Sequence, residues 1–295
     1  MWPFTKVPKQ ASLQQKGASF DLENCSIPQG STIGLIAGSG LFPFEFIKAA
    51  KHSGFNVVGV FHEDETSKNL EQELSAYTWI KLGQVGSLID TFKRHGVKHA
   101  AMVGGINRVK LFGGVRLDAR GALLMAKIRS TKDDRVMRGL ADELLSEGIE
   151  VVPSMVFMQD SLVMRGALTA RKFASFELED VEIGQAALAA MSAQDIGQLV
   201  VVKDGVITAV EAVEGSDQAI LRGGKLAGEG AIVVKFSKPT QDLRFDVPTI
   251  GLRTIETMIQ AKCRGLAVEA GKCLVLEREQ MVALANQHQI AIVGI

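Results

Sequence analysis

The chain of 295 residues contains no apolar run of the roughly 20 residues that a helix needs to cross a bilayer. Its first ten residues, MWPFTKVPKQ, also lack the apolar core of a secretory signal. Cysteine is scarce: Cys25, Cys263 and Cys273 are odd in number and have no metal-type spacing. This usage argues against a disulfide scaffold and suits a reducing compartment, so we expect a cytoplasmic protein.

Net charge of either sign is missing as well, because 33 basic residues balance 33 acidic ones. Nucleic-acid-binding domains usually carry a basic excess, so we expect no nucleic-acid partner. The five histidines show no metal spacing. His95 and His99 are four residues apart, but Gly96 between them ends a predicted helix, so a histidine metal site is not expected.

Hydrophobic residues make up 46% of the chain and charged residues 22%, which is typical of a globular protein with a real core. Short apolar runs alternate with helical patterns in the first half. We predict strands at 32–37, 56–61, 77–82, 98–106 and 149–154, and helices at 43–54, 86–96 and 130–148. Such alternation favours a mainly parallel sheet covered on both faces, in a Rossmann-like domain over residues 32–165.

The pattern changes after about residue 165. A hairpin signal at Asp204-Gly205 joins two strand-like runs. Further strands are predicted at 231–236, 265–271, 273–277 and 290–295, and helices at 253–262 and 279–288. We therefore expect an α/β fold whose second domain, residues 166–295, is mixed α/β. Residues 1–31 show no clear period and are expected to be a flexible extension, with peripheral contact of Trp2 and Phe4 with a membrane as the alternative.

Glycines follow one predicted strand and precede the helix that Pro43 begins. Gly38, Ser39 and Gly40 would place free backbone N–H groups at that helix's amino end, which is a seat for anions. The third glycine of a dinucleotide fingerprint is replaced by Pro43, and no P-loop lysine follows. The turn therefore favours ligand contact without favouring a dehydrogenase or an NTPase, and plain turn chemistry is the alternative.

A second pair of glycines, Gly104 and Gly105, ends another predicted strand of the same domain. Open α/β sheets bind ligands beyond the carboxyl ends of their strands. Two glycine turns at such ends favour a nucleotide or sugar pocket. Gln198, at the start of a later strand, carries an amide that could read a base or a sugar, although strand capping explains it equally well.

The stretch SKPTQDLRFDVPTIG, residues 237–251, has charged residues at every second position. In an extended strand, Asp242, Arg244 and Asp246 would share one face. A guanidinium binds phosphate oxygens with its planar fork, and carboxylates are oxygen ligands of the kind that Mg²⁺ takes. The alternative is a solvated strand face whose charges pair with one another.

One distance limits that prediction, because residues four apart on a strand are separated by about 13 Å. Asp242 and Asp246 could hardly meet on one metal ion across that gap, unless the backbone bends. A third acid is therefore expected, and Asp217, in the predicted turn EGSDQAI, is the candidate.

Several of these segments, in this order and spacing, are similar to those of one known family: IAGSGLFP, DIGQLVVV, AVEAVEGSD, KPTQDLRFDVPTIG and GLAVEAGKCLVLE. From about residue 32 to the end, the chain resembles the LpxI family of UDP-2,3-diacylglucosamine pyrophosphatases of lipid A biosynthesis. Ser39, Phe42 and Val109 replace a frequent glycine, leucine and proline of that pattern, and Ser216 replaces a threonine but keeps its hydroxyl.

The resemblance implies a reaction. UDP-2,3-diacylglucosamine would be hydrolysed to 2,3-diacylglucosamine 1-phosphate (lipid X) and UMP, with water attacking the α-phosphorus. It also implies a need for Mg²⁺ or another divalent cation, a substrate held between two domains, and a homodimer. A lipid substrate adds peripheral contact with the inner membrane as an open expectation for this cytoplasmic chain.

The residues expected at the site fall into two groups. The catalytic group is Asp242, Arg244, Asp246 and Asp217, of which the three carboxylates are also the expected metal ligands. The substrate-binding group is Gly38, Ser39, Gly40, Gly104, Gly105, Gln198, Lys238, Gln241 and Thr249. The alternative to an enzyme is a non-catalytic protein that senses a UDP-sugar or a related nucleotide, which would explain the glycine turns but leave the Asp-Arg-Asp motif without a role.

Overall fold

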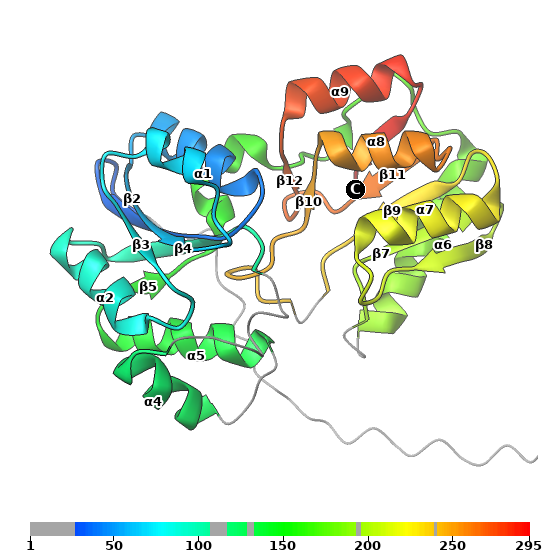
Figure 1. Cartoon of the computed structure of the whole chain (residues 1–295). Coiled ribbons are helices and arrows are strands. Elements are labelled where there is room, and N and C mark those ends of the chain that lie inside the picture. The colour runs from blue at the N-terminus through cyan, green and yellow to red at the C-terminus, as the bar shows by residue number, and fades with distance from the viewer. Residues whose placement is uncertain (1–26, 107–116, 129–132, 193–195, 239–240) are drawn as a thin grey trace, which may run out of the picture.

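The computed structural model describes residues 27–106, 117–128, 133–192, 196–238 and 241–295. Most of the expected amino-terminal extension therefore lies outside the described residues. The described chain forms two halves, each built on its own β-sheet (Figure 1). The α/β class is confirmed, with a parallel sheet in the first half and a mixed sheet in the second.

The first sheet has five strands in the order β3-β2-β1-β4-β5, and every pairing in it is parallel. Its strands are β1 Thr32–Ala37, β2 Asn56–His62, β3 Tyr77–Ile80, β4 His99–Val103 and β5 Glu150–Val151. The central strand β1 is apolar and buried along nearly its whole length, as expected for a parallel strand covered on both faces. All five strands were predicted from the alternating pattern.

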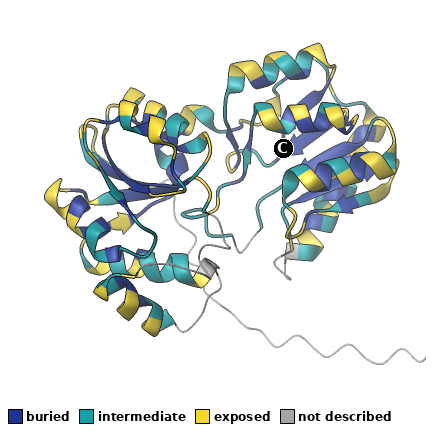
Figure 2. Cartoon of the chain, viewed as in Figure 1, coloured by how far each residue is buried: buried dark blue, intermediate teal, exposed yellow. Residues whose placement is uncertain are grey.

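Helices cover both faces of this sheet (Figure 1). The helix α1 (Phe42–His52) packs on one face with the 3₁₀ turns η1 (Lys68–Glu73) and η2 (Ser154–Phe157), and the turn η3 (Gln159–Ser161) follows. The helices α2 (Val85–Arg94), α4 (Ala119–Ile128) and α5 (Asp133–Ser146) pack on the other. Figure 2 shows buried strands between helices whose outer faces are exposed.

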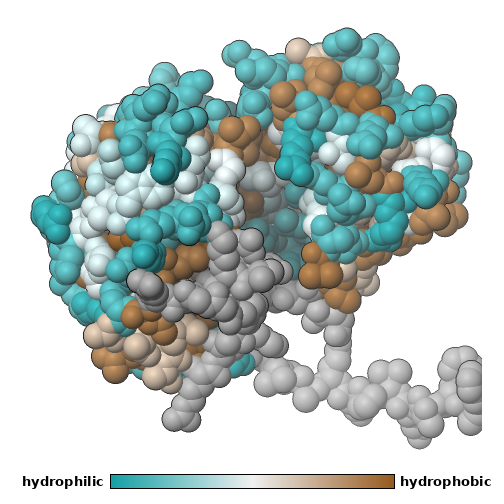
Figure 3. Space-filling model, viewed as in Figure 1, coloured by the Kyte–Doolittle hydropathy of each residue, from teal (hydrophilic) through white to brown (hydrophobic). Residues whose placement is uncertain are grey.

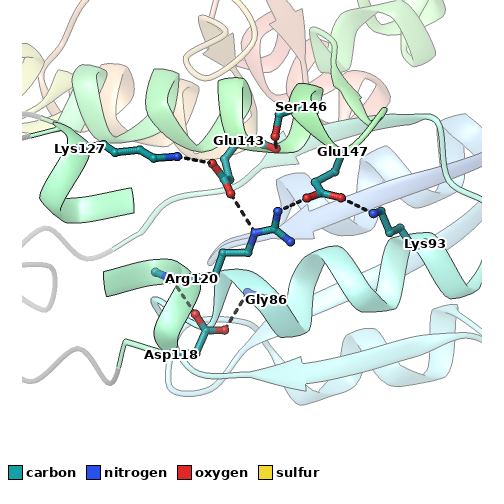
Figure 4. Close-up of polar contacts among 9 residues, drawn as sticks. Gly86, Lys93, Asp118, Arg120, Lys127, Glu143, Ser146 and Glu147 are labelled. Atoms are coloured by element: carbon teal, nitrogen blue, oxygen red, sulfur yellow. Dashed lines mark hydrogen bonds and ion pairs between the residues drawn. The ribbon is translucent and has the colours of Figure 1, made fainter. Parts of the chain in front are cut away.

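A polar network joins the three helices of the second face (Figure 4). Asp118 accepts hydrogen bonds from the backbone N–H groups of Gly86 and Gly121, each at 2.7 Å, and so caps α2 and α4 together. Arg120 of α4 then pairs with Glu143 of α5 and with Glu147 in the turn after α5. The hydrogen bond from Arg120, helped by Lys127, holds the pKa of Glu143 below its ordinary value. Because Lys93 of α2 also pairs with Glu147, the network holds α5 against α2 and α4.

The second sheet has six strands in the order β6-β13-β11-β9-β7-β8. Its strands are β6 Gly166–Ala167, β7 Leu199–Lys203, β8 Val206–Val210, β9 Ile232–Lys235, β11 Gly265–Val268 and β13 Ala291–Gly294. The strands β9, β11 and β13 are parallel, whereas β6, β7 and β8 join through antiparallel pairs. The hairpin at Asp204-Gly205 is confirmed, with positive φ at both residues.

Helix α6 (Ser175–Ser192) covers one face of this sheet, and α7 (Ser216–Ala227), α8 (Leu252–Gln260) and α9 (Arg278–Gln287) cover the other. Helices α4, α6 and α7 were not predicted. In particular, the expectation that Asp217 lies in a turn was wrong. Gly215, with φ of 83°, ends the preceding turn, and Asp217 lies in the first turn of α7.

A short parallel pair, β10 (Thr249–Ile250) with β12 (Leu274–Val275), lies between the two sheets (Figure 1). Leu274 of this pair is fully buried in the core of the first half, whereas Val275 and Ile250 belong to the core of the second. The two halves are therefore joined by shared apolar packing as well as by the chain. No helix within the described ranges has both the length and the apolar character to cross a membrane.

Candidate functional site

The two glycine turns meet at the carboxyl ends of β1 and β4. Ser39 N–H donates to the carbonyl of Gly105 at 2.7 Å, and Gly105 N–H donates back to Ser39 at 3.2 Å. A Cβ atom on Gly38 would lie 2.3 Å from the Gly105 carbonyl oxygen, and one on Gly104 would lie 2.6 Å from that of Ser39. Glycine is therefore required here by the close approach of two backbones. Both glycine pairs follow strand ends, as predicted. The expectation that Gly38 and Ser39 present free N–H groups was wrong, because these groups donate to the carbonyls of Val103 and Gly105 where the two backbones pair.

The amino end of α1 opens directly beyond these turns. Leu41 occupies the cap position without a side-chain hydrogen bond, and a proline lies at the start of the helix, as the sequence predicted. Beside it, His62 is 5% exposed, and its Nδ1 lies 3.0 Å from the carbonyl oxygen of Ala37. Burial lowers the pKa of His62. The amino end of α1 at this edge suits an anionic ligand.

The motif at 241–248 is not the extended strand that its alternating charges suggested. The carbonyl of Asp242 accepts hydrogen bonds from Phe245 N–H at 3.0 Å and Asp246 N–H at 3.2 Å, so the chain makes one tight turn. The prediction that Asp242, Arg244 and Asp246 share one face of a strand is therefore wrong. The physical reason is packing on two sides, because Leu243 and Val247 pack into one core of the first half and Phe245 into the other.

This turn removes the distance problem of the strand. Residues four apart in a helical turn have Cβ atoms about 5–6 Å apart, compared with about 13 Å along a strand. Asp242 and Asp246 are thus held on one turn. Figure 1 shows the segment running between the two halves.

Arg244 folds back onto Asp242. Its Nε and Nη2 donate to the two carboxylate oxygens at 2.9 and 2.8 Å, and its guanidinium lies 4.9 Å from the centre of the Phe245 ring. Arg138 of α5 approaches the same carboxylate at 3.8 Å. Burial opposes ionisation of Asp242, but the hydrogen bonds and charge of Arg244, with Arg138 behind it, outweigh burial and hold its pKa below the ordinary value.

The other two predicted metal ligands have different surroundings. Asp246 is exposed, and its carboxylate has no partner among the described residues. Asp217 pairs with Arg253 at 2.8 Å. No group of three or more histidine, cysteine, aspartate or glutamate side chains is placed to hold a metal ion in the described part of the chain. The structure thus brings Asp242 and Asp246 onto one turn and leaves Asp217 on a separate helix.

The predicted substrate-binding side chains of the second half are brought together. Gln241 Nε2 donates to Gln198 Oε1 at 3.2 Å and to the carbonyl of Asp246 at 2.9 Å. Gln241 Oε1 accepts from the backbone N–H of Lys238 at 2.9 Å. The side-chain amide of Gln241 therefore links Gln198, just before β7, with the backbone of Lys238 and Asp246.

Two charged residues of this region, Lys235 and Glu211, were not predicted to be buried. Lys235, 6% exposed at the end of β9, donates to Ser216 Oγ at 3.3 Å and to the carbonyl of Thr249 at 2.9 Å. Ser216 Oγ in turn donates to Glu211, 7% exposed, at 2.9 Å. Arg138 was missed as well. Charged residues flanking a strand end or on a helix carry no local signal of burial, so only the tertiary fold reveals them.

Figure 3 shows this face of the molecule hollowed between the two halves. Two further cavities lie elsewhere. One is behind α1, beside Lys48, His52 and Phe157, and the other is at the amino ends of the second sheet's strands, beside Arg171 and Arg264. Neither is lined by a predicted site residue. The cysteines Cys263 and Cys273 are buried, and burial raises the pKa of both thiols to about 12, so neither is a reactive thiol.

Comparison with solved structures yields only weak likenesses. The biotin carboxylase domain of a thermophilic 2-oxoglutarate carboxylase, bound to ADP, is 14% identical with a TM-score of 0.25, over 58% of this chain and 34% of that chain. A protein described as gox2253 is 10% identical with a TM-score of 0.27, over 88% of each chain. These scores are too low to support an argument about fold or function.

Comparison with protein families and curated proteins is more informative. The model of the LpxI N-terminal domain matches residues 32–161, and that of the LpxI C-terminal domain matches residues 164–293. The UDP-2,3-diacylglucosamine pyrophosphatase LpxI of Caulobacter vibrioides is 27% identical over 274 residues, which cover 89% of this chain and 97% of that protein. The chain therefore belongs to the LpxI family.

Proposed function

We propose that this chain hydrolyses UDP-2,3-diacylglucosamine to lipid X and UMP at the hollow between its two halves. As a member of the LpxI family it is a hydrolase, and its curated relative is named for this substrate. The observation that carries the proposal is the Asp242–Arg244 pair, held on a tight turn between the halves and tied to each of them.

The residues of the turn would have different roles in the reaction. Arg244 would stabilise the negative charge that builds on the phosphoryl oxygens during attack on the α-phosphorus. One carboxylate of the turn, Asp242 or Asp246, would accept a proton from the attacking water. Arg244 keeps Asp242 ionised, and the carboxylate of Asp246 has no partner among the described residues, so both are candidates for this role.

The glycine turns would hold the diphosphate. Backbone N–H groups at the amino end of α1 favour anions, and Gly38 and Gly105 leave the strand edge free of side-chain bulk. Gln198, Gln241, Lys238 and Thr249 would orient the uridine and sugar from the other half.

The donor set suits Mg²⁺, although its carboxylates are few. Mg²⁺ is usually bound by one or two carboxylates together with substrate phosphates, so three converging acids are not needed. Asp246, whose oxygens have no partner among the described residues, would hold the ion together with the diphosphate, and Asp242 would support it from the same turn. When bound, the ion would offset charge on the diphosphate. Asp217, which lies on a separate helix from the turn with Asp242 and Asp246, is the weakest of the three predicted ligands.

The proposal is tested by incubating the purified chain with UDP-2,3-diacylglucosamine and Mg²⁺, with and without EDTA, and measuring UMP. We expect UMP and lipid X in equal amounts, loss of turnover in EDTA, and recovery on adding excess Mg²⁺. Tight binding of the UDP-sugar without product would instead support the sensing protein. Full turnover in EDTA would contradict the metal requirement.

The remaining expectations are part of the same proposal. The chain would act in the cytoplasm as a homodimer and meet its lipid substrate by peripheral contact with the inner membrane. Light scattering at micromolar concentration tests the dimer. Co-sedimentation with vesicles of anionic phospholipid, with neutral vesicles as the control, tests the membrane contact.

A further inference from the structure

The buried residues Lys235 and Glu211 and the half-buried Ser216 form a hydrogen-bonded series at the amino end of β7 and the carboxyl ends of β8 and β9. The ammonium of Lys235 donates to the Ser216 hydroxyl, and that hydroxyl donates to Glu211 Oε1. The other carboxylate oxygen of Glu211 accepts from the backbone N–H of Gln198 at 3.1 Å. A lysine and a glutamate are thus buried on either side of one hydroxyl.

Burying two charges is costly unless they satisfy one another and the groups around them. Here the cation has no carboxylate within salt-bridge distance among the described residues, and its contacts are a hydroxyl and a carbonyl. Apolar side chains of similar volume could pack at these positions at little cost to stability. The arrangement is therefore poorly explained by stability alone.

Each end of the Lys235–Ser216–Glu211 series contacts a part of the candidate site. Lys235 holds the carbonyl of Thr249, where the charged motif ends. Glu211 holds Gln198, whose side chain accepts a hydrogen bond from Gln241, where the motif begins. Ser216 lies at the first residue of α7, next to Asp217. The three residues thus connect both ends of the segment 241–249 with the helix that carries the third predicted acid.

We propose that Lys235, Ser216 and Glu211 are positioning residues that hold the segment 241–249 in its reactive shape. None of them is assigned to contact the substrate. They act through Gln198 and Thr249 by fixing where the turn with Asp242 and Arg244 begins and ends. This inference rests on the proposed function for its kinetic consequence, but the placement of the segment is testable without substrate.

The kinetic test compares Lys235→Met, Lys235→Arg and Glu211→Gln with the control Lys225→Met. Lys225 is exposed on α7 and has no side-chain partner among the described residues. Because small displacements at a reacting centre cost about 10²-fold in rate, we expect kcat to fall by about 10²-fold in Lys235→Met while KM changes less than about threefold. Lys235→Arg, which keeps a buried cation, should recover much of the loss. A purely structural role would lower the melting temperature and the active fraction without this recovery.

The second readout is amide hydrogen exchange in the substrate-free protein. In Lys235→Met, exchange should quicken at Phe245 and Asp246, whose N–H groups bond to Asp242, and at the start of α7, while the first sheet stays protected. Unchanged exchange in those segments, or a loss confined to KM, would overturn the proposal. If the wild-type chain releases no UMP, the proposed function fails and the exchange measurement alone decides the positioning role.

Discussion

Arg244 Nε and Nη2 donate to the two carboxylate oxygens of Asp242 at 2.9 and 2.8 Å, within one turn of backbone. Two parallel hydrogen bonds of this kind fix orientation as well as charge. Arg244 is therefore oriented by the acid before any substrate arrives. In an enzyme that stabilises phosphoryl charge, such preorganisation means that the guanidinium need not be reoriented during the reaction.

Substitution of either member of this pair should abolish most turnover. We expect Asp242→Asn and Arg244→Met to lower kcat by about 10²–10³-fold, the range seen when one preorganised charge-stabilising donor is removed. Arg244→Lys should lower kcat nearly as much as Arg244→Met, because a lysine ammonium lacks the planar fork that fits the Asp242 carboxylate. Steady-state UMP release measures the effect. Arg94→Met, an exposed residue on α2, serves as the control, and wild-type rates in Asp242→Asn would remove that residue from the mechanism.

The same pair makes stability depend on pH in acid. The pKa of Asp242 is lower in the folded chain than its ordinary value of about 3.8, so the stabilising contribution is complete above pH 3.8 and is lost as pH falls through the folded pKa. Arg244→Met lacks that contribution. Its deficit in unfolding free energy, measured by urea titration, should therefore be largest near pH 6–7 and shrink below about pH 3.8. A deficit that grew in acid would contradict this origin.

The close approach of the two glycine turns predicts an asymmetric response to alanine. Gly38→Ala would place a Cβ atom 2.3 Å from a backbone carbonyl oxygen, whereas Gly105→Ala would meet only the Ser39 hydroxyl at 3.2 Å. A backbone carbonyl cannot move aside as a serine hydroxyl can by changing its rotamer. Gly38→Ala should therefore lower the free energy of unfolding by about 1–3 kcal/mol, and Gly105→Ala should lower it by clearly less. Urea unfolding of the two variants measures this, and equal costs would show that the turns can separate freely.

His62 makes stability depend on pH as well, but at higher pH than Asp242 does. Burial lowers its pKa in the folded chain, so below about pH 6.5 the unfolded chain binds more protons and the folded state loses stability. We expect His62→Gln to flatten the fall in unfolding free energy between pH 7 and pH 5. His288→Gln, at an exposed position, should leave that slope unchanged. An unchanged slope in His62→Gln would mean that the imidazole charges in the folded state.

The site of water attack is open to isotope labelling. Hydrolysis in water enriched with ¹⁸O should place the label in UMP and leave lipid X unlabelled, if attack occurs at the α-phosphorus. Mass spectrometry of the two products decides this. Label in the lipid phosphate would move the attack to the β-phosphorus and reverse which phosphoryl group faces Arg244.

Sequence reasoning predicted the first sheet well because its signals are local. Each strand there is an apolar run between turns, and Gly38 and Gly104 mark the strand ends directly. The second half was harder. Helix α6 was missed although it spans Ser175–Ser192, and α7 was taken for a turn because its start, Ser216-Asp217, follows a glycine.

The charged motif shows why the site could be found by its residue types but not by its shape. Alternating charged and apolar residues resemble a strand, and nothing local distinguishes that from a turn. The outcome depends on Phe245 and Leu243 entering different cores, which is a tertiary fact. The burial of Lys235 and Glu211 likewise follows from elements far apart in sequence, so it had no local signal.

The central claim is that the diphosphate lies between the glycine turns of the first half and the segment 241–249. It is tested most directly by a crystal structure of Asp242→Asn with UDP-2,3-diacylglucosamine, since loss of catalysis should leave the substrate intact. We predict phosphate oxygens within hydrogen-bond distance of Arg244 and of the backbone N–H of Gly40, since the N–H groups of Gly38 and Ser39 donate to backbone carbonyls. A diphosphate seated instead in the cavity behind α1, or at the amino ends of the second sheet's strands, would contradict the account.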